Sequence, residues 1–254
     1  MFERGGRRIG LSPARRFIVD LMSASDRVPT IPMERRMNLA KLAQMRNRGP
    51  VRFGWCALFV QAYARVAART PELRRVFLPW PWPHLYEHPK VIANIAVERQ
   101  YGGEPVVLFG ILHSPEQGPL TRTQAYVDHL KNDPVPEVRP FRRALRFARL
   151  PWPLRRILWR GVLDVSGEQR AKTLGNFGIS AVAATGASQL WIRSPLTTTL
   201  YYGPFDSSHS LDVRLVFDHR VIDGAFAGRV LAELEAALCD EMPAEIAGGS
   251  SAAA

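Results

Sequence analysis

The stretch "FDHRVIDG", residues 217–224, joins two different periodic patterns. Before it, "SLDVRLVFDHR" alternates apolar and polar residues with a period of two, which predicts a half-buried strand. After it, "DGAFAGRVLAELEAALCDEM" places Phe226, Val230, Leu234 and Leu238 along one side of a predicted helix. A histidine, an arginine and two aspartates thus occupy a strand–helix junction, where a rigid scaffold can hold reactive groups.

The spacing of His219 and Asp223 does not by itself separate a catalytic pair from an ordinary polar turn. His129 and Asp133 have the same spacing, and they lie at the polar end of a predicted surface helix, where a solvated face explains them. The position of His219 at the end of a predicted strand is what distinguishes it.

The composition is that of a globular protein with a hydrophobic core, because 46% of the 254 residues are hydrophobic. Cys56 and Cys239 lie in apolar, helix-like segments, so we expect core residues and a reducing cytoplasm rather than a disulfide or metal site. We expect neither a signal peptide nor a membrane span, since no run approaches the roughly 18 apolar residues that a span needs. The formal net charge of +11 predicts attraction to polyanions.

Helical and extended patterns are interleaved without a linker, which predicts one α/β domain over residues 12–242. Residues 1–11 and 243–254 are expected to be flexible. Ser12 is expected to cap a first helix with Pro13 at its first position. A buried helix is predicted from about Trp55 to Arg69.

Extended segments are predicted on both sides of that helix. "VPTIPMERRM" contains two prolines and is expected to be an edge strand or an extended arm, while "KVIANIAVERQ" and "GEPVVLFGIL" are expected to be strands joined by the turn "YGG". "LPWPWPHLYEHP" is expected to be a loop, and residues 173–202 are expected to form strands and tight turns.

The segment "FDHRVIDGAFAGRVLAELEAAL" closely resembles the Asp-His-Arg-x-x-Asp-Gly signature of the acyltransferase core of 2-oxo-acid dehydrogenase complexes, and in looser form that of chloramphenicol acetyltransferase. "SPARRFIVDLM", "PTIPMERRMNLAKL", "ANIAVERQYGGEPVVLFGIL", "GNFGIS" and "TTTLYYGPF" resemble further segments of that family in the same order. The resemblance covers about residues 12–242. It implies a chloramphenicol acetyltransferase-like two-layer α/β sandwich, with a mixed sheet packed by helices, assembled as a homotrimer or a larger assembly of trimers.

The resemblance implies transfer of an acyl group between coenzyme A and an unidentified acceptor, without a covalent acyl-enzyme. His219 would be the general base at a channel between subunits, since an imidazole can accept a proton at neutral pH. Asp223 would orient the loop through an ion pair with Arg15 or, in reserve, Arg16; it could also be a helix N-terminal acid stabilised by the dipole. Gly224 would allow the backbone to turn tightly where the helix begins. The other supporting positions of the motifs are Asp218, Arg220 and Asn176.

The sequence departs from the family at the position of its oxyanion-stabilising serine, which is Gly175 here. Losing one such donor commonly costs about 2.7–4 kcal/mol of transition-state stabilisation. Thr173 is expected on the same strand face but ~6.6 Å away. A backbone N–H or the hydroxyl of Thr199 could replace the missing oxyanion donor, or the alignment with the family could be shifted locally. A trimeric scaffold without efficient chemistry remains the alternative function.

No lipoyl domain or subunit-binding module is recognisable before the core, so we expect no lipoyl group on this chain. Acyl-CoA is expected as a substrate, free or with another protein's acyl carrier as partner, and no metal is expected. Nucleic acid is not an expected partner, because the aromatic residues cluster with prolines instead of alternating with basic residues on strands.

Residues 138–163, "VRPFRRALRFARLPWPLRRILWRGVL", contain no acidic residue, where the family has a more polar helix. This composition fits an interfacial membrane helix pair, with arginines on anionic headgroups and tryptophans at the boundary. It fits equally a helix pair that packs on the core or on a subunit. In the first case the protein would lie at the inner face of the membrane. The residues expected on this membrane or partner surface are Arg142, Arg143, Arg146, Trp152, Arg155, Arg156 and Trp159.

Overall fold

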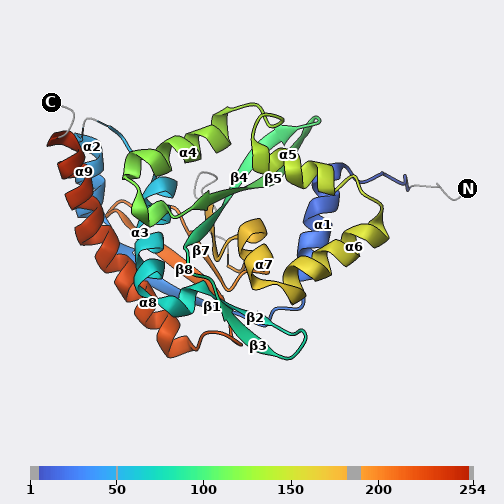
Figure 1. Cartoon of the computed structure of the whole chain (residues 1–254). Coiled ribbons are helices and arrows are strands. Elements are labelled where there is room, and N and C mark those ends of the chain that lie inside the picture. The colour runs from blue at the N-terminus through green and yellow to red at the C-terminus, as the bar shows by residue number, and fades with distance from the viewer. Residues whose placement is uncertain (1–5, 50, 182–189, 252–254) are drawn as a thin grey trace, which may run out of the picture.

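A six-stranded mixed sheet lies at the centre of the computed structural model, which describes residues 6–49, 51–181 and 190–251. The strand order across it is β1, β8, β7, β6, β4, β5 (Figure 1). β4 pairs in parallel with β6, and β6 with β7, whereas the β1–β8, β7–β8 and β4–β5 pairs are antiparallel. The strands are Thr30–Asn38 (β1), Ile92–Tyr101 (β4), Glu104–His113 (β5), Phe177–Ala181 (β6), Thr198–Tyr202 (β7) and Ser210–Asp218 (β8).

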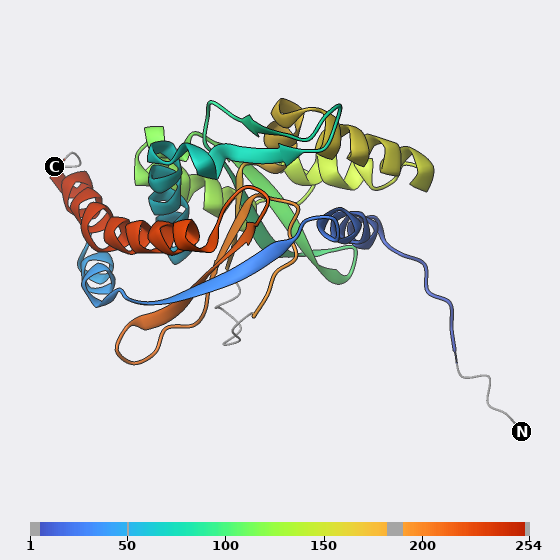
Figure 2. The same ribbon diagram turned by 90° about the horizontal axis from the view of Figure 1, so that it is seen from below.

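Two groups of helices cover this sheet. α3, α4 and α8 pack on its strands in one group, while α1, α5 and α7 contact β5 and α6 packs on α1 (Figures 1 and 2). The predicted α/β class, a mixed sheet packed by helices, is therefore confirmed. The helices are Pro13–Ser25 (α1), Ala40–Arg48 (α2), Trp55–Arg69 (α3), Leu120–Asn132 (α4), Arg139–Phe147 (α5), Trp152–Arg160 (α6), Gly167–Leu174 (α7), Gly224–Ala236 (α8) and Met242–Ser251 (α9).

The central helix α3 begins and ends where the sequence predicts, and most of its side chains are buried. Alanine, leucine, phenylalanine and valine on nearly all sides make this helix apolar throughout, so it lies between the sheet and the other helices. Phe59 stacks on Tyr202 with ring centroids 4.2 Å apart. The buried Tyr63 hydroxyl donates to Thr198 Oγ1 at 3.0 Å, which satisfies its polar atom inside the core.

The predicted start of the first helix, α1, is confirmed in detail. Ser12 Oγ accepts the backbone N–H of Arg15 at 3.1 Å, and Pro13 is the first residue of α1.

The turn between β4 and β5 contains Gly102 and Gly103 with φ angles of 64° and 81°, a conformation that glycine adopts at little cost.

Three segments differ from the predictions. A hairpin of β2 (Arg75–Leu78) and β3 (His84–Glu87) forms where a loop was expected, because four-residue strands are too short to show an alternating pattern. The helix α7 continues to Leu174, so the expected strand at 173 is absent from this part of the described chain. The tail expected to be flexible from residue 243 is helical as far as Ser251, and its Ile246 is buried. Residues 6–12 form no regular structure; residues 1–5 and 252–254 lie outside the described residues.

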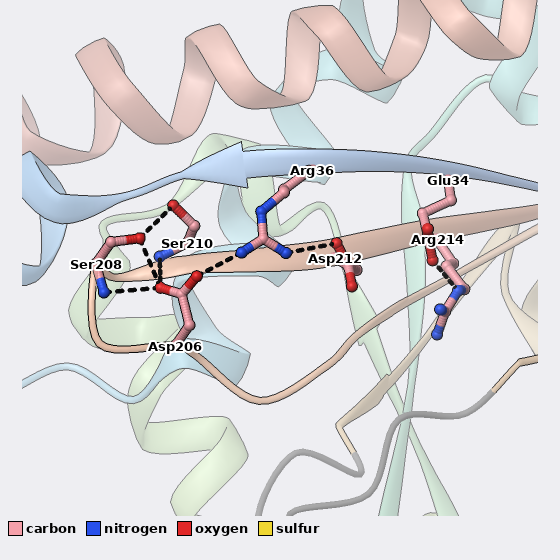
Figure 3. Close-up of polar contacts among 7 residues, drawn as sticks. All are labelled: Glu34, Arg36, Asp206, Ser208, Ser210, Asp212 and Arg214. Atoms are coloured by element: carbon pink, nitrogen blue, oxygen red, sulfur yellow. Dashed lines mark hydrogen bonds and ion pairs between the residues drawn. The ribbon is translucent and has the colours of Figure 1, made fainter.

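The predicted edge strand is confirmed as β1, which pairs only with β8 among the described strands. Ion pairs hold it to the turn before β8 and to β8 itself (Figure 3). Arg36 contacts both Asp206 and Asp212, and Asp206 in turn accepts the backbone N–H of Ser210 at 2.9 Å. These contacts fix the register of the strand that carries the histidine motif.

Two of the residues expected on a membrane or partner surface are instead buried. Arg155 points inward from α6, and its Nε donates to Asp20 Oδ2 at 2.6 Å with both side chains only 7% exposed. Trp159, one helical turn later, packs against Phe17 and Phe147. Since residues four apart share one face of a helix, both side chains belong to the interior.

Replacing Arg155 with alanine should lower the free energy of unfolding by about 3–5 kcal/mol, because the Asp20 carboxylate would remain buried without its partner. Arg143→Ala, on the exposed face of the neighbouring helix, is the matched control and should change stability by less than about 0.5 kcal/mol. Urea denaturation followed by circular dichroism measures both. Equal stability of the two variants would contradict the buried ion pair.

Candidate active site

The histidine motif lies at the end of β8. Leu211, Val213, Leu215 and Phe217 point into the core, as the alternation predicts, and the strand ends at Asp218. The backbone then turns, with the N–H groups of residues 221 and 222 donating to the carbonyl of Asp218 at 3.0 and 3.1 Å. α8 begins at residue 224, so the whole motif occupies one tight strand–helix connection.

A bidentate ion pair closes this turn. Asp218 is fully buried, and its two carboxylate oxygens accept Arg220 Nε at 2.9 Å and Nη2 at 2.7 Å. The Arg220 guanidinium also lies 4.4 Å from the ring centroid of Phe77, a cation–π distance. Paired hydrogen bonds of this kind are strong and directional, so they fix the conformation of the residues between and after them.

One nitrogen of the His219 ring has a hydrogen-bond partner among the described residues, and the other has none there. Its Nδ1 lies 3.0 Å from the backbone carbonyl of Ile222. Because a carbonyl oxygen can only accept, Nδ1 carries the proton in the neutral ring and Nε2 keeps its lone pair. The side chain is 45% exposed, so a reacting group can reach it from outside this chain.

Asp223 lies at the N-cap of α8, but its side chain makes no capping hydrogen bond there. Its Oδ1 is 3.6 Å from His219 Nδ1, and the side chain is 88% exposed. The expected ion pair with Arg15 or Arg16 is not formed within the described chain. α1 packs on α5, α6 and β5, away from α8 (Figure 1), and Arg16 Nε donates to the Leu11 carbonyl.

The position of Gly224 does not require glycine. It has no positive φ, and a Cβ placed there would meet only Met33 Cε, at 3.6 Å. The sequence-based interpretation of this glycine as a tight-turn residue is therefore wrong.

Gly175 is a different case, because its backbone conformation and its surroundings both demand glycine. Its φ is 84° and its ψ is 177°, a region that is essentially restricted to glycine. A Cβ at this position would lie 2.8 Å from the carbonyl oxygen of Ile92. A serine like that of the resembling family does not fit this backbone.

Asn176 holds the Gly175 turn against the start of β4. Its Oδ1 accepts the backbone N–H of Ile92 at 2.6 Å, and Asn94 Nδ2 donates to the carbonyl of Leu174 at 2.7 Å. The N–H of Gly175 donates to Ala171 and that of Asn176 to Ile92, both at 2.8 Å. Neither backbone N–H is therefore available as the substitute oxyanion donor.

The two hydroxyls considered as substitutes differ in their surroundings. Thr173 lies in α7, so its expected place on a strand beside Gly175 is wrong. Thr199 lies on β7 opposite Gly178, and its Oγ1 is buried without a hydrogen-bond partner in the described structure. An unpaired buried hydroxyl is unusual and keeps its donor available.

Sequence reasoning missed Arg170, a buried arginine of α7. Its guanidinium donates to the carbonyls of Phe77, Leu163 and Pro195. Burial lowers the pKa of Arg170 to about 10, against the opposing effect of the Asp218 carboxylate. Arg170 lines both a cavity of about 210 Å³, shared with Arg220, and a space of about 10 Å³ beside Gly175. His219 lines neither of these two cavities.

Within the described residues, no group of three or more His, Cys, Asp or Glu side chains could hold a metal ion. In the same part of the chain, no helix combines the length and the apolar character needed to cross a bilayer.

Comparison with known proteins places the fold. No protein-family model and no curated sequence matches the chain. Among solved structures, it is similar to a probable dihydrolipoamide acetyltransferase from Listeria monocytogenes, with 18% identity, a TM-score of 0.65, and coverage of 92% of this chain and 94% of that chain. The chain has an acyltransferase fold. The dihydrolipoamide acetyltransferase of Azotobacter vinelandii is similar at 17% identity and a TM-score of 0.66, covering 92% of each chain. A chloramphenicol acetyltransferase is similar at 10% identity and a TM-score of 0.51, covering 90% of this chain and 96% of that chain, so the expected fold is confirmed.

Gly175→Ser, which introduces the family's serine, should destabilise the protein by at least about 1–3 kcal/mol, the cost of holding a side chain in this backbone region. The contact with the Ile92 carbonyl adds to that cost. Gly224→Ala is the matched control and should be neutral or stabilising by up to about 1 kcal/mol. Thermal unfolding of both variants tests the assignment, and a serine variant as stable as wild type would refute it.

Proposed function

We propose that the protein transfers an acyl group between coenzyme A and an acceptor, with His219 as general base. The observation that carries this proposal is the hydrogen bond from His219 Nδ1–H to the Ile222 carbonyl, which leaves Nε2 of this partly exposed side chain as the proton acceptor. In the Azotobacter enzyme, a serine, a histidine and an asparagine are the residues whose role in the catalytic mechanism was investigated.

The reaction proceeds by direct attack. Nε2 takes the proton of the attacking thiol as its sulfur bonds to the thioester carbonyl carbon, and a tetrahedral oxyanion forms. When the C–S bond to the leaving group breaks, the same nitrogen returns the proton to the departing thiolate. The imidazole ends as it began, and no acyl-enzyme forms.

Stabilisation of the oxyanion is the weak part of this site. Gly175 offers no hydroxyl, and the N–H groups of its turn are already used. Thr199 is the remaining candidate donor, because its buried hydroxyl has no partner among the described residues. Loss of a single such donor lowers kcat about 10²–10³-fold, so we expect a slow enzyme.

We further propose that the protein works in the cytoplasm as a trimer or an assembly of trimers, with the exposed ring of His219 facing a neighbouring copy. The thiols of Cys56 and Cys239 are both free, as in a reducing compartment, and burial raises the pKa of the Cys56 thiol to about 11. Asp223 would gain its orienting partner at such a junction. The competing function is a scaffold of the same fold without efficient chemistry, and the poor oxyanion site is the observation that favours it.

His219→Ala should lower the rate of acetyl transfer from acetyl-CoA to dihydrolipoamide by about 10²–10⁴-fold, the usual contribution of a general base. His129→Ala is the matched control, since His129 has the same spacing to an aspartate, with 2.6 Å between Nδ1 and the Asp133 carboxylate, but lies on α4. Its rate should equal that of wild type. Equal rates for all three proteins would remove His219 from the chemistry, and no turnover by wild type with any acyl-CoA would favour the scaffold.

A further inference from the structure

The outer surface of α5 and α6 combines positive charge with exposed apolar side chains. α5 buries Phe141 and Leu145 and turns its arginines outward. An ordinary surface helix buries its apolar side chains, whereas α6 buries the charged Arg155 and exposes three of its aliphatic residues. Both helices lie at the same end of the molecule as α1 (Figures 1 and 2).

The orientation of α6 is fixed by its buried contacts. Arg155 pairs with Asp20, and Trp159 packs between Phe17 and Phe147, so this helical face cannot turn outward. At 100° per residue, Ile157 lies directly opposite this buried face, and Leu154 and Leu158 lie together on one flank of the helix. The exposed fractions of Leu154, Ile157 and Leu158 are 43%, 67% and 41%, and Trp152 at the start of the helix is 56% exposed.

The charged residues of 138–163 all have one sign. Residues 138–163 contain no acidic residue, and Arg155 is the only arginine among them with a carboxylate within 4.0 Å in the described structure. The others are exposed, and Arg156 lies over the Trp152 ring at 4.8 Å. A second copy of the same face would meet it with the same charge, which disfavours a two-fold contact between copies through this surface.

We propose that this surface binds the anionic headgroups of a phospholipid membrane, with α6 lying in the plane of the interface. Leu154, Ile157 and Leu158 insert among the upper acyl chains, Trp152 lies at the headgroup boundary, and the arginines of α5 contact the phosphates. A purely electrostatic ligand such as nucleic acid would gain no binding energy from the exposed Leu154, Ile157 and Leu158. This inference stands independently of the proposed acyl transfer, because it uses no residue of the histidine motif.

Co-sedimentation tests the proposal with two kinds of vesicle, phosphatidylcholine alone and phosphatidylcholine mixed with phosphatidylglycerol. Wild type should sediment with the mixed vesicles at low salt and stay in solution with the neutral ones. Leu154→Ser/Ile157→Ser should bind the mixed vesicles at least about tenfold more weakly, and Arg142→Gln/Arg143→Gln/Arg146→Gln should do the same. Val107→Ser is the matched control, because Val107 is an exposed aliphatic residue of β5, and it should bind like wild type.

Three results would overturn the proposal. The first is wild type that remains in solution with the mixed vesicles at low salt. The second is a serine double variant that binds as well as wild type, which would reduce the effect to charge alone. The third is binding to heparin or to an acidic polypeptide without binding to the vesicles. Circular dichroism of each variant confirms that these exposed substitutions leave the fold intact, and the acetyl-transfer rate of the variants shows that the histidine site is separate.

Discussion

The bidentate pair between Asp218 and Arg220 is the contact on which the candidate site depends. A fully buried carboxylate must be paired, and here its partner is only two residues away, so the pair closes the backbone turn as well as neutralising the charge. That turn presents the Ile222 carbonyl to His219 Nδ1. Pairing of β8 with β1 supports the same geometry from outside, since the His219 N–H donates to the carbonyl of Pro29. Together these contacts direct Nδ1 to the Ile222 carbonyl, so Nε2 is the nitrogen that keeps its lone pair.

A second rigid turn, at Gly175, occupies the position at which the resembling family has its serine. Asn176 and Asn94 hold this turn against β4, and the backbone N–H groups of Gly175 and Asn176 already donate to carbonyls. The Ile92 carbonyl occupies the space that a Cβ of residue 175 would need. Arg170 donates to three backbone carbonyls and lines one cavity with Gly175 and another with Arg220. The same packing that makes this turn rigid leaves no room for a serine side chain at Gly175.

The sequence predicts what local patterns determine. Alternation along residues 210–218 predicts β8, Ser12 and Pro13 predict the start of α1, and the apolar character of residues 55–69 predicts α3. The resemblance of the motif predicts the place of His219 but not the partner of its Nδ1, because Ile222 contributes a backbone carbonyl. Local sequence patterns do not reveal which residues far apart in the sequence pair with each other. Arg155 and Arg156 are adjacent and chemically identical, and only the position of Asp20, 135 residues earlier, decides which one is buried. For the same reason Arg15 is not paired with Asp223 in the chain, and Arg170 carries no signal in "GEQRAKT".

The tautomer of His219 tests the central claim most directly. Nitrogen-15 NMR of the histidine-labelled protein distinguishes protonated from unprotonated ring nitrogens, and the spectrum of His219→Ala assigns the signals that belong to this ring. With the ring neutral, the hydrogen bond to the Ile222 carbonyl requires a proton on Nδ1 and none on Nε2. A proton on Nε2, with Nδ1 bare, would show that the Ile222 carbonyl does not hold the ring and that the nitrogen proposed as the base has no lone pair to offer.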